Sequence, residues 1–421
     1  MKVLLISANT ERINLLPLPL GLGCVAAATR AAGHEVRMLD LMAEGDPESV
    51  LRKAIADFTP GVIGISVRNI DDQNRRGRFL LEGIRPLVRT CREHSGAAIV
   101  LGGAGYSIFP EAVLDFLEAD MGIQGEGERT FPLLVDRLER REELPGIPGL
   151  YLRNRGLQGE RRFVRDLDSL PLSGAHEFLH SQSRELWLPF QTRRGCPMAC
   201  SYCSTATIEG SAVRKRSPAA AVADLFRYAE SGFRQVYFVD NTFNLPSAYA
   251  KRLCREILEQ GLEIRWRCIL YPGKVDKELA GLMAEAGCGE VSLGFESGCN
   301  RILRNMNKRF DRDGIRRTAE MMAQRGIRQL GFLLLGGPGE TRESVLESLA
   351  FADTLPLGQG KVTAGIRIYP GTALAHAAVA DGMIPPEDDL FRPRFYLARE
   401  LEGWLPETLE AWMADRPQWM T

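Results

Sequence analysis

Along the first third of the chain, short apolar runs alternate with stretches whose apolar residues recur at the helical period. The apolar runs predict strands at Lys2–Ala8, Glu35–Leu41, Val62–Arg68, Ala98–Gly103 and Met121–Gly127. The other stretches predict helices at Gly21–Ala32, Pro47–Phe58, Arg76–Glu93, Pro110–Phe116 and Glu128–Arg140. This order is typical of a doubly wound parallel sheet, which binds its ligand beyond the carboxyl ends of the strands.

The same alternation returns after a linker, for which Leu144–Leu150 supplies prolines and glycines and Leu150–Val164 the pattern of a hairpin. The second set of predicted strands is Leu186–Gln191, Val236–Asp240, Glu263–Leu270, Gly289–Ser297, Arg328–Gly336 and Val362–Tyr369. The second set of predicted helices is Ala219–Ser231, Ser247–Gln260, Asp276–Ala286, Arg312–Gly326 and Thr341–Thr354. Strands and helices in this order indicate an incomplete parallel (β/α)6 barrel, open on one side.

These patterns predict an α/β protein with four segments. Residues 1–143 form a Rossmann-like domain, 144–185 a linker with a hairpin, 186–372 the partial barrel and 373–421 a short C-terminal segment. A chain of 421 residues is longer than one ordinary hydrophobic core organises, which agrees with two folded domains.

Composition narrows the class of protein. Hydrophobic residues make up 45% of the chain and charged residues 25%, as in globular domains. The net charge of -1 gives no overall field that would attract nucleic acid or an anionic membrane. The first residues lack the pattern of a signal peptide, and no apolar run reaches the roughly 18 residues of a membrane span. We therefore expect a cytoplasmic protein with no membrane span and no nucleic acid partner, with a local basic patch left as an alternative.

Three of the nine cysteines lie close together, at Cys196, Cys200 and Cys203, directly after the first predicted barrel strand. Thiolates at this C-x3-C-x2-C spacing can each bind one iron of a cuboidal cluster, which leaves the fourth iron without a protein ligand. A zinc site would normally have four ligands, and no histidine lies nearby in the sequence. A zinc loop and thiols without any metal remain alternatives. Because the chain shows no export signal, metal binding is favoured over disulfides.

At these residues the chain resembles the radical S-adenosylmethionine superfamily, whose members carry C-x3-C-x-aromatic-C after the first barrel strand. The resemblance implies a [4Fe–4S] cluster whose open iron binds S-adenosylmethionine, and reductive cleavage of that molecule to a 5′-deoxyadenosyl radical. It implies further contacts to S-adenosylmethionine from the aromatic position of the loop and from the ends of later strands, at Tyr202, Asp240, Asn241, Arg267, Glu296, Ser297, Gly336 and Gly337. Glycine-rich turns also have a purely structural use, as tight connections in any barrel.

The N-terminal domain resembles the cobalamin-binding domains that precede such barrels. Glycines at strand ends would let the corrin ring approach the backbone closely. The residues that this resemblance assigns to cobalamin are Leu20, Gly21, Ser66, Arg68, Asn69, Gly102, Gly103, Gly125, Glu126 and Gly127. The sequence lacks the D-x-H-x-x-G motif of domains that bind cobalt through a histidine, and we expect His34 and His94 to be solvated loop residues. Arg68 and Asn69 are then candidates to tune the cobalt without ligating it.

Together the two resemblances imply a cobalamin-dependent radical S-adenosylmethionine methyltransferase. It would methylate a poorly activated carbon, or phosphorus, of a small metabolite through a 5′-deoxyadenosyl radical and methylcobalamin, with electrons from an external donor such as flavodoxin or ferredoxin. The sequence identifies no catalytic side chain of its own. A cyclase or rearrangement enzyme with the same cofactors is the main alternative. A non-catalytic cobalamin sensor is less favoured. So is a tRNA methylthiotransferase, because the N-terminal domain holds only Cys24 and Cys91.

Overall fold

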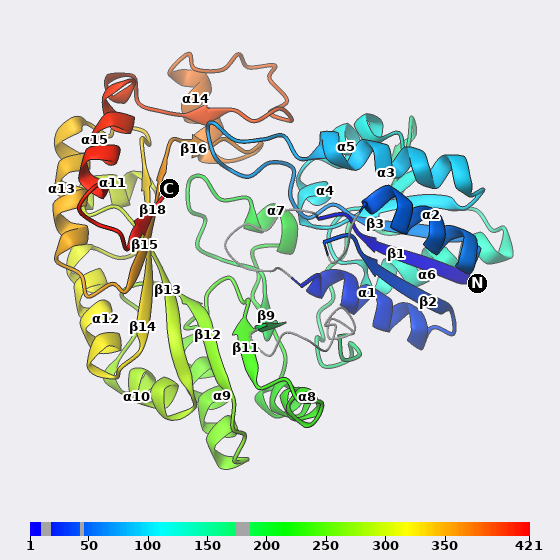
Figure 1. Ribbon diagram of the computed structural model, residues 1–421, viewed down its shortest axis with the longest axis horizontal. Helices are drawn as coiled ribbons and strands as arrows, with labels where there is room; N and C mark the ends of the chain where they lie inside the picture. Colours follow the sequence, from blue (N-terminus) through cyan, green and yellow to red (C-terminus); the bar gives the residue numbers. More distant parts are fainter. Residues whose placement is uncertain (10–17, 43–45, 174–185) are drawn as a thin grey trace. The chain divides into compact units, whose positions relative to one another are not determined.

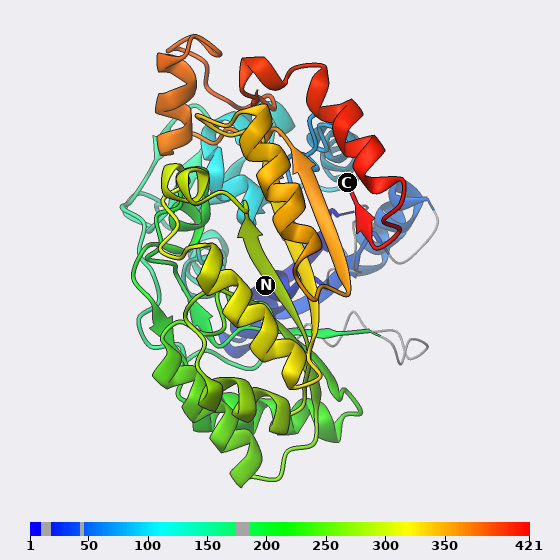
Figure 2. The ribbon, with the colours of Figure 1, turned by 90° about the vertical axis from the view of Figure 1, so that its left-hand side faces the viewer.

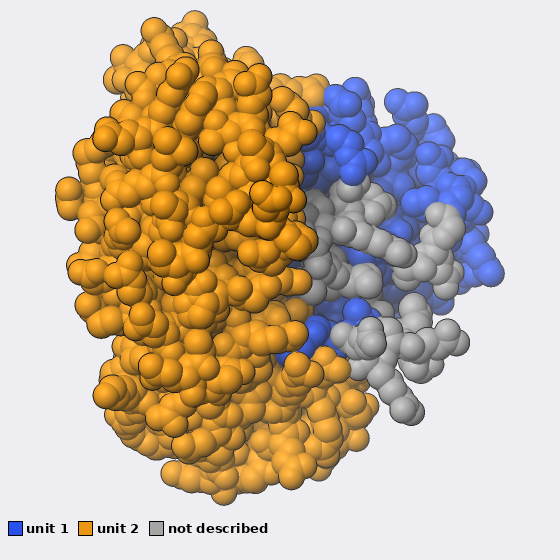
Figure 3. Space-filling model, turned by 60° about the vertical axis from the view of Figure 1, so that its left-hand side comes forward, with its two compact units in different colours: residues 1–72, 77–189, 207–210 blue, residues 73–76, 190–206, 211–421 orange. Residues whose placement is uncertain are grey.

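The structure is a computed structural model that describes residues 1–9, 18–42, 46–173 and 186–421. These residues form two compact units, coloured separately in Figure 3. The N-terminal unit comprises residues 1–72, 77–189 and 207–210, and the C-terminal unit comprises 73–76, 190–206 and 211–421. The last part of the expected linker, residues 174–185, lies outside the described residues.

The N-terminal unit is built on one mainly parallel sheet. Its strands are β1 (Lys2–Ser7), β2 (Glu35–Asp40), β3 (Val62–Ser66), β4 (Ala98–Gly102), β5 (Met121–Ile123), β6 (Leu150–Leu152) and β7 (Gly156–Leu157). Their order in the sheet is β2-β1-β3-β4-β5-β6-β7. The first five strands are parallel, and β6 and β7 add to the edge as an antiparallel hairpin. The hairpin that the sequence predicts within a linker is thus part of this sheet.

Helices cover both faces of this sheet (Figure 1). They are α1 (Leu20–Ala31), α2 (Pro47–Phe58), α3 (Leu81–His94), α4 (Ala104–Ile108), α5 (Pro110–Leu117) and α6 (Gly127–Arg140). α1 packs against α6, while α2 and α5 pack against α3. Because both faces are covered, the interiors of β1, β3 and β4 are buried on both sides, which explains their unbroken apolar runs.

Two local differences from the sequence prediction shape the edge where the strands end. The helix expected at Arg76–Glu93 begins only at Leu81, because residues 67–80 form a loop in which the Leu80 N–H donates to the Ile70 carbonyl. The short helix α4 follows β4 without a linker, after Gly103 with a φ of 102°. The segments that follow β3 and β4 at this edge are therefore a hydrogen-bonded loop and a short helix, and not simple turns.

The C-terminal unit is a second parallel sheet, curved as an open barrel. Its strands are β8 (Leu188–Phe190), β11 (Gln235–Phe238), β12 (Arg265–Leu270), β13 (Cys288–Glu296), β14 (Arg328–Leu335), β15 (Gln359–Ala364) and β18 (Trp419–Met420). Their order is β18-β15-β14-β13-β12-β11-β8. Short strands outside this sheet are β9 (Arg193–Arg194), β10 (Arg214–Lys215), β16 (Ile366–Arg367) and β17 (Phe395–Tyr396).

A row of helices covers one face of this sheet (Figures 1 and 2). The helices of the row are α8 (Pro218–Glu230), α9 (Ser247–Glu259), α10 (Lys277–Glu285), α12 (Arg312–Gln324) and α13 (Arg342–Asp353). The remaining helices are α7 (Thr205–Glu209), α11 (Asn300–Asn305), α14 (Ala373–Ala380), the 3₁₀ helix η2 (Arg399–Leu401) and α15 (Trp404–Met413). Along β12 and β14 buried side chains alternate with half-buried ones, so one face packs on helices and the other lines the barrel interior.

The C-terminal segment contributes a strand that the sequence does not predict. β18 pairs with β15 and extends the expected barrel sheet. The ring of Trp419 lies on Gly360, where a Cβ atom would come within 2.4 Å of it. Trp412 contacts Trp419 edge to face, and Arg416 forms an ion pair with Asp353 on α13. The aromatic side chains of this segment therefore pack it onto the sheet.

Side chains at helix starts explain where several helices begin. The N-cap side chains that accept a backbone N–H are Asp46, Ser217, Asp276, Asp311, Thr341 and Thr372. Among the described residues, none of these helices has the length and apolar character needed to span a bilayer.

Candidate functional site

A loop with three cysteines follows the first strand of the C-terminal unit's sheet. Cys196, Cys200 and Cys203 come shortly after β9, and none of the three forms a disulfide. Cys196 and Cys200 are half-buried and Cys203 is exposed. Three thiols on one short loop can each bind one iron of a cuboidal iron–sulfur cluster.

The start of this loop is held by a buried carboxylate. Asp240 follows β11 and has no exposed surface. Its Oδ1 accepts the backbone N–H groups of Thr192 at 2.7 Å and Arg193 at 2.8 Å. Its Oδ2 accepts the Thr192 hydroxyl at 2.6 Å and Nη2 of Arg193 at 2.7 Å. Both oxygens are therefore occupied by the cysteine loop, and in this structure Asp240 positions that loop.

The guanidinium of Arg193 connects the same loop to the segment after β11. The Arg193 side chain is only 3% exposed. It donates to the Phe243 carbonyl and lies 5.0 Å from the ring centroid of Phe243 and 4.6 Å from that of Tyr249. Asn241 is half-buried in this segment. The start of the cysteine loop and the connection after β11 are thus joined by buried hydrogen bonds.

The middle of the cysteine loop is anchored by the residues after α11. The N–H of Ser201 donates to the Met306 carbonyl at 3.1 Å. The side chain of Asn307 donates to the Ala199 carbonyl at 2.7 Å. Ala199 and Asn307 both have positive φ angles, 49° and 57°. These long-range bonds fix a backbone shape that the loop's own sequence does not favour.

Tyr202, Glu296 and Lys308 form a buried polar triad beside the cysteines. The Tyr202 hydroxyl donates to Oε1 of Glu296 at 2.9 Å, and Nζ of Lys308 lies 2.9 Å from that hydroxyl and 3.2 Å from the same carboxylate oxygen. Burial raises the pKa of Tyr202, Glu296 adds to this, and Lys308 opposes it. Burial acts to lower the pKa of Lys308, but Glu296 and Tyr202 outweigh it and the pKa is raised. Lys308 is therefore a buried cation at neutral pH.

Glu296 and Ser297 point to different surroundings although they are adjacent. The sheet register shifts between Gly294 and Glu296, and Glu296 has a φ of 62°. The bulge carries the Glu296 side chain to Tyr202, while its Oε2 has no hydrogen bond to the described residues. Ser297 is fully buried, and its hydroxyl pairs with that of Ser348 at 2.9 Å. Only Glu296 of this pair thus offers an acceptor beside the cysteine loop.

Arg267 lies in a different part of the barrel. It forms an ion pair with Glu290 at 3.7 Å and lies over the ring of Tyr237 at 4.8 Å. Glu290 precedes Glu296 by six residues on the same strand, a separation of roughly 20 Å. The structure therefore does not bring Arg267 together with Tyr202 and Glu296.

The glycines after β14 are held by a buried glutamate. Oε2 of Glu340 accepts the N–H groups of Gly336 at 2.5 Å and Gly337 at 3.0 Å. The Gly336 carbonyl accepts the N–H of Ala398, and the Gly337 carbonyl accepts that of Glu340. Both backbone groups of both glycines are thus used within the fold. Gly336 and Gly337 can shape a surface for a ligand, but both of their N–H groups are already bonded to Glu340.

The pKa of Glu340 predicts a pH-dependent stability. Burial raises this pKa from 4.5 to about 7, against the opposing effects of the two glycine N–H groups and of Arg301. The folded chain therefore holds the proton more tightly than the unfolded chain, and this stabilisation is complete below pH 4.5 and lost as the pH rises through 7. In Glu340→Gln the amide oxygen keeps both acceptor bonds without a charge. As the pH rises from 5 to 8, we expect the unfolding free energy of the wild type to fall by about 2–3 kcal/mol relative to that of Glu340→Gln.

Urea unfolding of both proteins at pH 5, 6.5 and 8 checks this expectation. The control is Glu340→Ala, which removes the acceptor and should be less stable than Glu340→Gln at every pH. Parallel pH curves for the wild type and Glu340→Gln would contradict the assignment.

The residues assigned to a second cofactor lie along the carboxyl edge of the N-terminal unit's sheet. Strand order reverses between β1 and β3, which makes this point of the sheet a topological switch point. Open parallel sheets bind ligands at such a switch point. The assigned residues at the ends of β3, β4 and β5 or at the starts of α1 and α6 are Leu20, Gly21, Ser66, Arg68, Asn69, Gly102, Gly103, Gly125, Glu126 and Gly127.

Close packing and positive φ angles explain two of the glycines at this edge, Gly103 and Gly125. A Cβ atom on Gly103 would lie 2.6 Å from the carbonyl oxygen of Val67, and its φ of 102° disfavours other residues. Gly125 has a φ of 90°. Oε2 of Glu126 accepts the N–H of Val164 at 2.6 Å, so this side chain is already engaged inside the unit. Arg68 is exposed and Asn69 half-buried.

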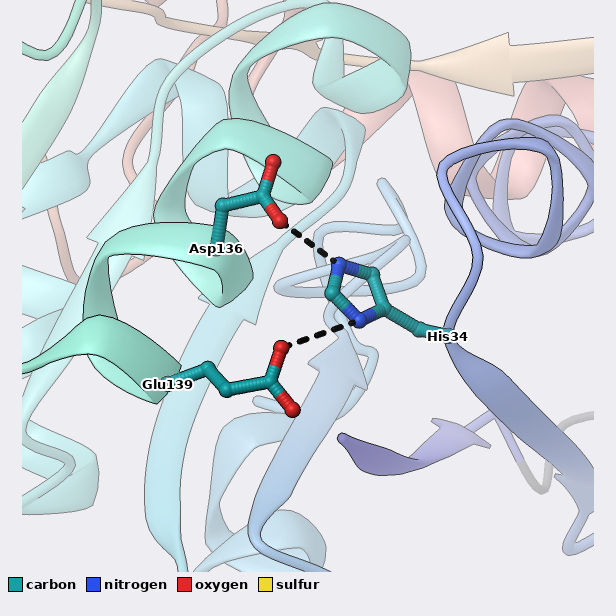
Figure 4. A group of neighbouring side chains, drawn as sticks. All are labelled: His34, Asp136 and Glu139. Carbon is teal, nitrogen blue, oxygen red and sulfur yellow. Dashed lines mark ion pairs between the residues drawn. The ribbon is translucent and has the colours of Figure 1, made fainter.

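His34 is buried, which corrects the expectation of a solvated loop residue. It lies between two acids of α6 (Figure 4), with Nε2 3.4 Å from Asp136 and Nδ1 3.9 Å from Glu139. The N-terminal amine lies 3.4 Å from Nδ1 and pairs with Glu139 at 2.7 Å. Because the two carboxylates approach opposite ring nitrogens, the arrangement fits an imidazole held between charges and not three ligands around one ion. These contacts tie the start of β2 to α6.

Sequence reasoning missed four residues of the site. Arg193, Asn307, Lys308 and Glu340 all hold the loops at the carboxyl edge of the barrel sheet. Lys308 is 106 positions from Tyr202 and follows no strand, so no local pattern marks it. Glu340 did carry a signal, since an acid directly after a Gly-Gly-Pro-Gly turn is well placed to accept the turn's N–H groups.

Comparisons with known proteins agree with both parts of the chain. Residues 191–352 match the Radical SAM superfamily, and residues 6–135 match the B12 binding domain. The chain is 29% identical to an uncharacterized methyltransferase of Pyrococcus horikoshii, over 91% of this chain and 84% of that protein. It is 26% identical to cytidylyl-2-hydroxyethylphosphonate methyltransferase of Streptomyces wedmorensis, over 89% of this chain and 80% of that protein.

A solved structure shows the same fold. The radical S-adenosylmethionine methyltransferase TsrM from Kitasatospora setae, with cobalamin and a [4Fe–4S] cluster bound, superposes with a TM-score of 0.87 at 22% identity. The match covers 100% of this chain and 92% of that one. The doubly wound sheet and the partial barrel predicted from the sequence are thereby confirmed.

Proposed function

Because the chain belongs to the radical S-adenosylmethionine enzymes that carry a cobalamin-binding domain, we propose that it methylates a poorly activated carbon, or phosphorus, of a small metabolite. One observation carries this proposal: a three-thiol loop at the end of a barrel strand and a β1/β3 switch point occur in the same chain. The two relatives named above are methyltransferases, and their alignments span both domains.

Cys196, Cys200 and Cys203 are proposed to hold the cluster. The chemistry of their donors supports this, because three thiols on one short loop, none of them in a disulfide, leave one iron of the cluster for a ligand that is not protein. When bound, the cluster supplies the electron that cleaves S-adenosylmethionine and cobalamin carries the methyl group. The role of the chain is to hold, orient and shield these groups.

Tyr202, Asn241 and Glu296 are proposed to contact S-adenosylmethionine directly. Oε2 of Glu296 can accept a hydroxyl of the ribose, since only its Oε1 is bonded to Tyr202 and Lys308. Gly336 and Gly337 are proposed to make van der Waals contact with the adenine through their backbone. Asp240 and Ser297 are proposed to act indirectly: Asp240 positions the cysteine loop, and Ser297 positions the end of β13. Arg267 is proposed to stabilise the barrel through Glu290.

The carboxyl edge of the N-terminal sheet is proposed to bind cobalamin. The switch point between β1 and β3 supports this, as do the tightly packed glycines after β4 and β5. Arg68 and Asn69 are proposed to lie near the lower face of the corrin, and Leu20 and Gly21 near its edge. Electrons are proposed to come from a small external donor such as flavodoxin or ferredoxin.

Anaerobic purification with added hydroxocobalamin, followed by turnover with a low-potential reductant, tests the proposed function. We expect about one cobalamin per chain and formation of both S-adenosylhomocysteine and 5′-deoxyadenosine from S-adenosylmethionine. With a deuterated methyl donor, the label should appear in the bound cobalamin. Formation of 5′-deoxyadenosine alone would favour a cyclase or rearrangement enzyme. A protein that retains no cobalamin would contradict the assignment of the N-terminal unit.

A further inference from the structure

Lys308 places a positive charge inside the polar triad beside the cysteine loop. It lies in the connection between α11 and α12, and its side chain is only 6% exposed. Nζ contacts the Tyr202 hydroxyl at 2.9 Å and Oε1 of Glu296 at 3.2 Å, and lies 5.1 Å from the centroid of the Tyr202 ring. Burying an ammonium group carries a penalty of several kcal/mol, so this cation is held in place by its partners.

The same ammonium lies beside the stretch of the loop that carries Cys200. Its partner Tyr202 stands between Cys200 and Cys203 in the chain. The segment that ends in Lys308 is hydrogen-bonded along this stretch, from the Asn307 side chain to the Ala199 carbonyl at 2.7 Å and from the Ser201 N–H to the Met306 carbonyl at 3.1 Å. Lys308 and Glu296 thus place opposite charges beside the loop that holds Cys200.

We propose that Lys308 raises the reduction potential of the iron–sulfur cluster, and that Glu296 lowers it. Reduction adds one electron from a low-potential donor to the cluster and breaks no bond, so the cluster and its thiolates become more negative by one charge. A fixed positive charge beside Cys200 stabilises that state, and water screens it weakly because the Lys308 side chain is only 6% exposed. Net charge and hydrogen bonds to the sulfurs are the known determinants of cluster potentials.

This inference rests on the proposed function only in that a cluster binds at Cys196, Cys200 and Cys203. It concerns the equilibrium of reduction and not the identity of the methylated substrate. It assigns to Lys308 a positioning and tuning role, through Cys200 and Tyr202.

Redox titration of the cluster-loaded full chain, without substrate or S-adenosylmethionine, tests the inference. The reduced cluster is quantified by electron paramagnetic resonance, and iron is measured in every sample. For Lys308→Met we expect the equilibrium constant of reduction to fall about tenfold, which is a midpoint about 59 mV more negative. For Glu296→Gln we expect a shift of similar size to a less negative midpoint. Lys308→Arg keeps the charge and should stay close to the wild type.

Tyr202→Phe is the matched control, because it removes a hydrogen bond of the triad without changing its charge. We expect its midpoint to change less than threefold in equilibrium constant. A merely structural role for Lys308 would lower the iron content or move both charge variants in the same direction. Equal midpoints for the wild type and Lys308→Met at full iron content would overturn the inference.

If Lys308→Met does not retain iron, the midpoint potential of Glu296→Gln alone tests the inference. A less negative midpoint than that of the wild type supports the inference, and an unchanged midpoint overturns it. Failure of the proposed function is distinguishable: a chain that binds the cluster but transfers no methyl group leaves this redox test unchanged, whereas a wild-type chain without a four-iron cluster overturns the inference together with the cluster assignment.

Discussion

Cys200→Ala is expected to lose the iron–sulfur cluster and, with it, all cleavage of S-adenosylmethionine. The three thiols of the loop supply every protein ligand that the cluster is proposed to have, and Cys200 is the middle one. Removing it leaves two adjacent irons without a protein ligand. We expect iron to fall from about four per chain to background after anaerobic reconstitution, and 5′-deoxyadenosine to fall below detection. Iron assay and electron paramagnetic resonance measure the first effect, and chromatography of the products measures the second.

Cys254→Ala is the matched control for this experiment. Cys254 lies on α9, outside the cysteine loop in the sequence, and it is fully buried. Burial raises its pKa, so it packs as a small apolar side chain and not as a thiolate. This variant should keep its iron and lose only stability, by about 1 kcal/mol. Full iron in Cys200→Ala would remove the cysteine loop as the cluster site.

Asp240→Asn is expected to be strongly destabilising and to impair cluster loading. The carboxylate and the Arg193 guanidinium are 0% and 3% exposed, and the substitution leaves the guanidinium buried without its counter-charge. Breaking a buried ion pair in this way typically lowers the free energy of unfolding by about 3–5 kcal/mol. The backbone N–H groups of Thr192 and Arg193 also lose part of their acceptor. Because these residues begin the cysteine loop, iron content should fall as well.

Chemical denaturation of the iron-free chain, together with iron content after reconstitution, measures both effects. The comparison is Glu118→Gln, which removes an exposed ion pair with Arg85 and should change stability by less than about 1 kcal/mol. The double variant Arg193→Met/Asp240→Asn should lose less than the sum of its two single variants, because it leaves no uncompensated charge. Equal stability of Asp240→Asn and Glu118→Gln would show that Asp240 does not anchor the loop.

The sequence by itself determined the order of strands and helices and the cysteine motif. Both are written in local patterns: the helical period, the apolar runs of β1, β3 and β4, and the spacing of three cysteines in eight residues. Capping residues such as Asp46 and Thr341 mark helix starts in the same local way. Because a parallel sheet brings all strand ends to one edge, the sequence could also name the two edges at which cofactors are expected.

The tertiary structure alone decided which residues near those edges face a ligand. Asp240, Glu296 and Ser297 all follow strands and look alike in the sequence. In the fold, both carboxylate oxygens of Asp240 accept hydrogen bonds from Thr192 and Arg193, and the Ser297 hydroxyl pairs with that of Ser348. Only Glu296, at the bulge in β13, turns its carboxylate toward Tyr202. These differences come from partners far away along the chain, which no local pattern encodes.

The same reason explains the elements that the sequence assigned to other roles. The hairpin of β6 and β7 and the C-terminal strand β18 were predicted as linker and tail. They belong to the two sheets because they pair with the edge strands β5 and β15, and because the ring of Trp419 packs on Gly360, which has no side chain. Local periodicity specifies what an element is, whereas edge pairing and packing over long sequence separations specify where it goes. Lys308 is the clearest example of such long-range packing, because it contacts Tyr202 on a loop about a hundred residues earlier in the chain.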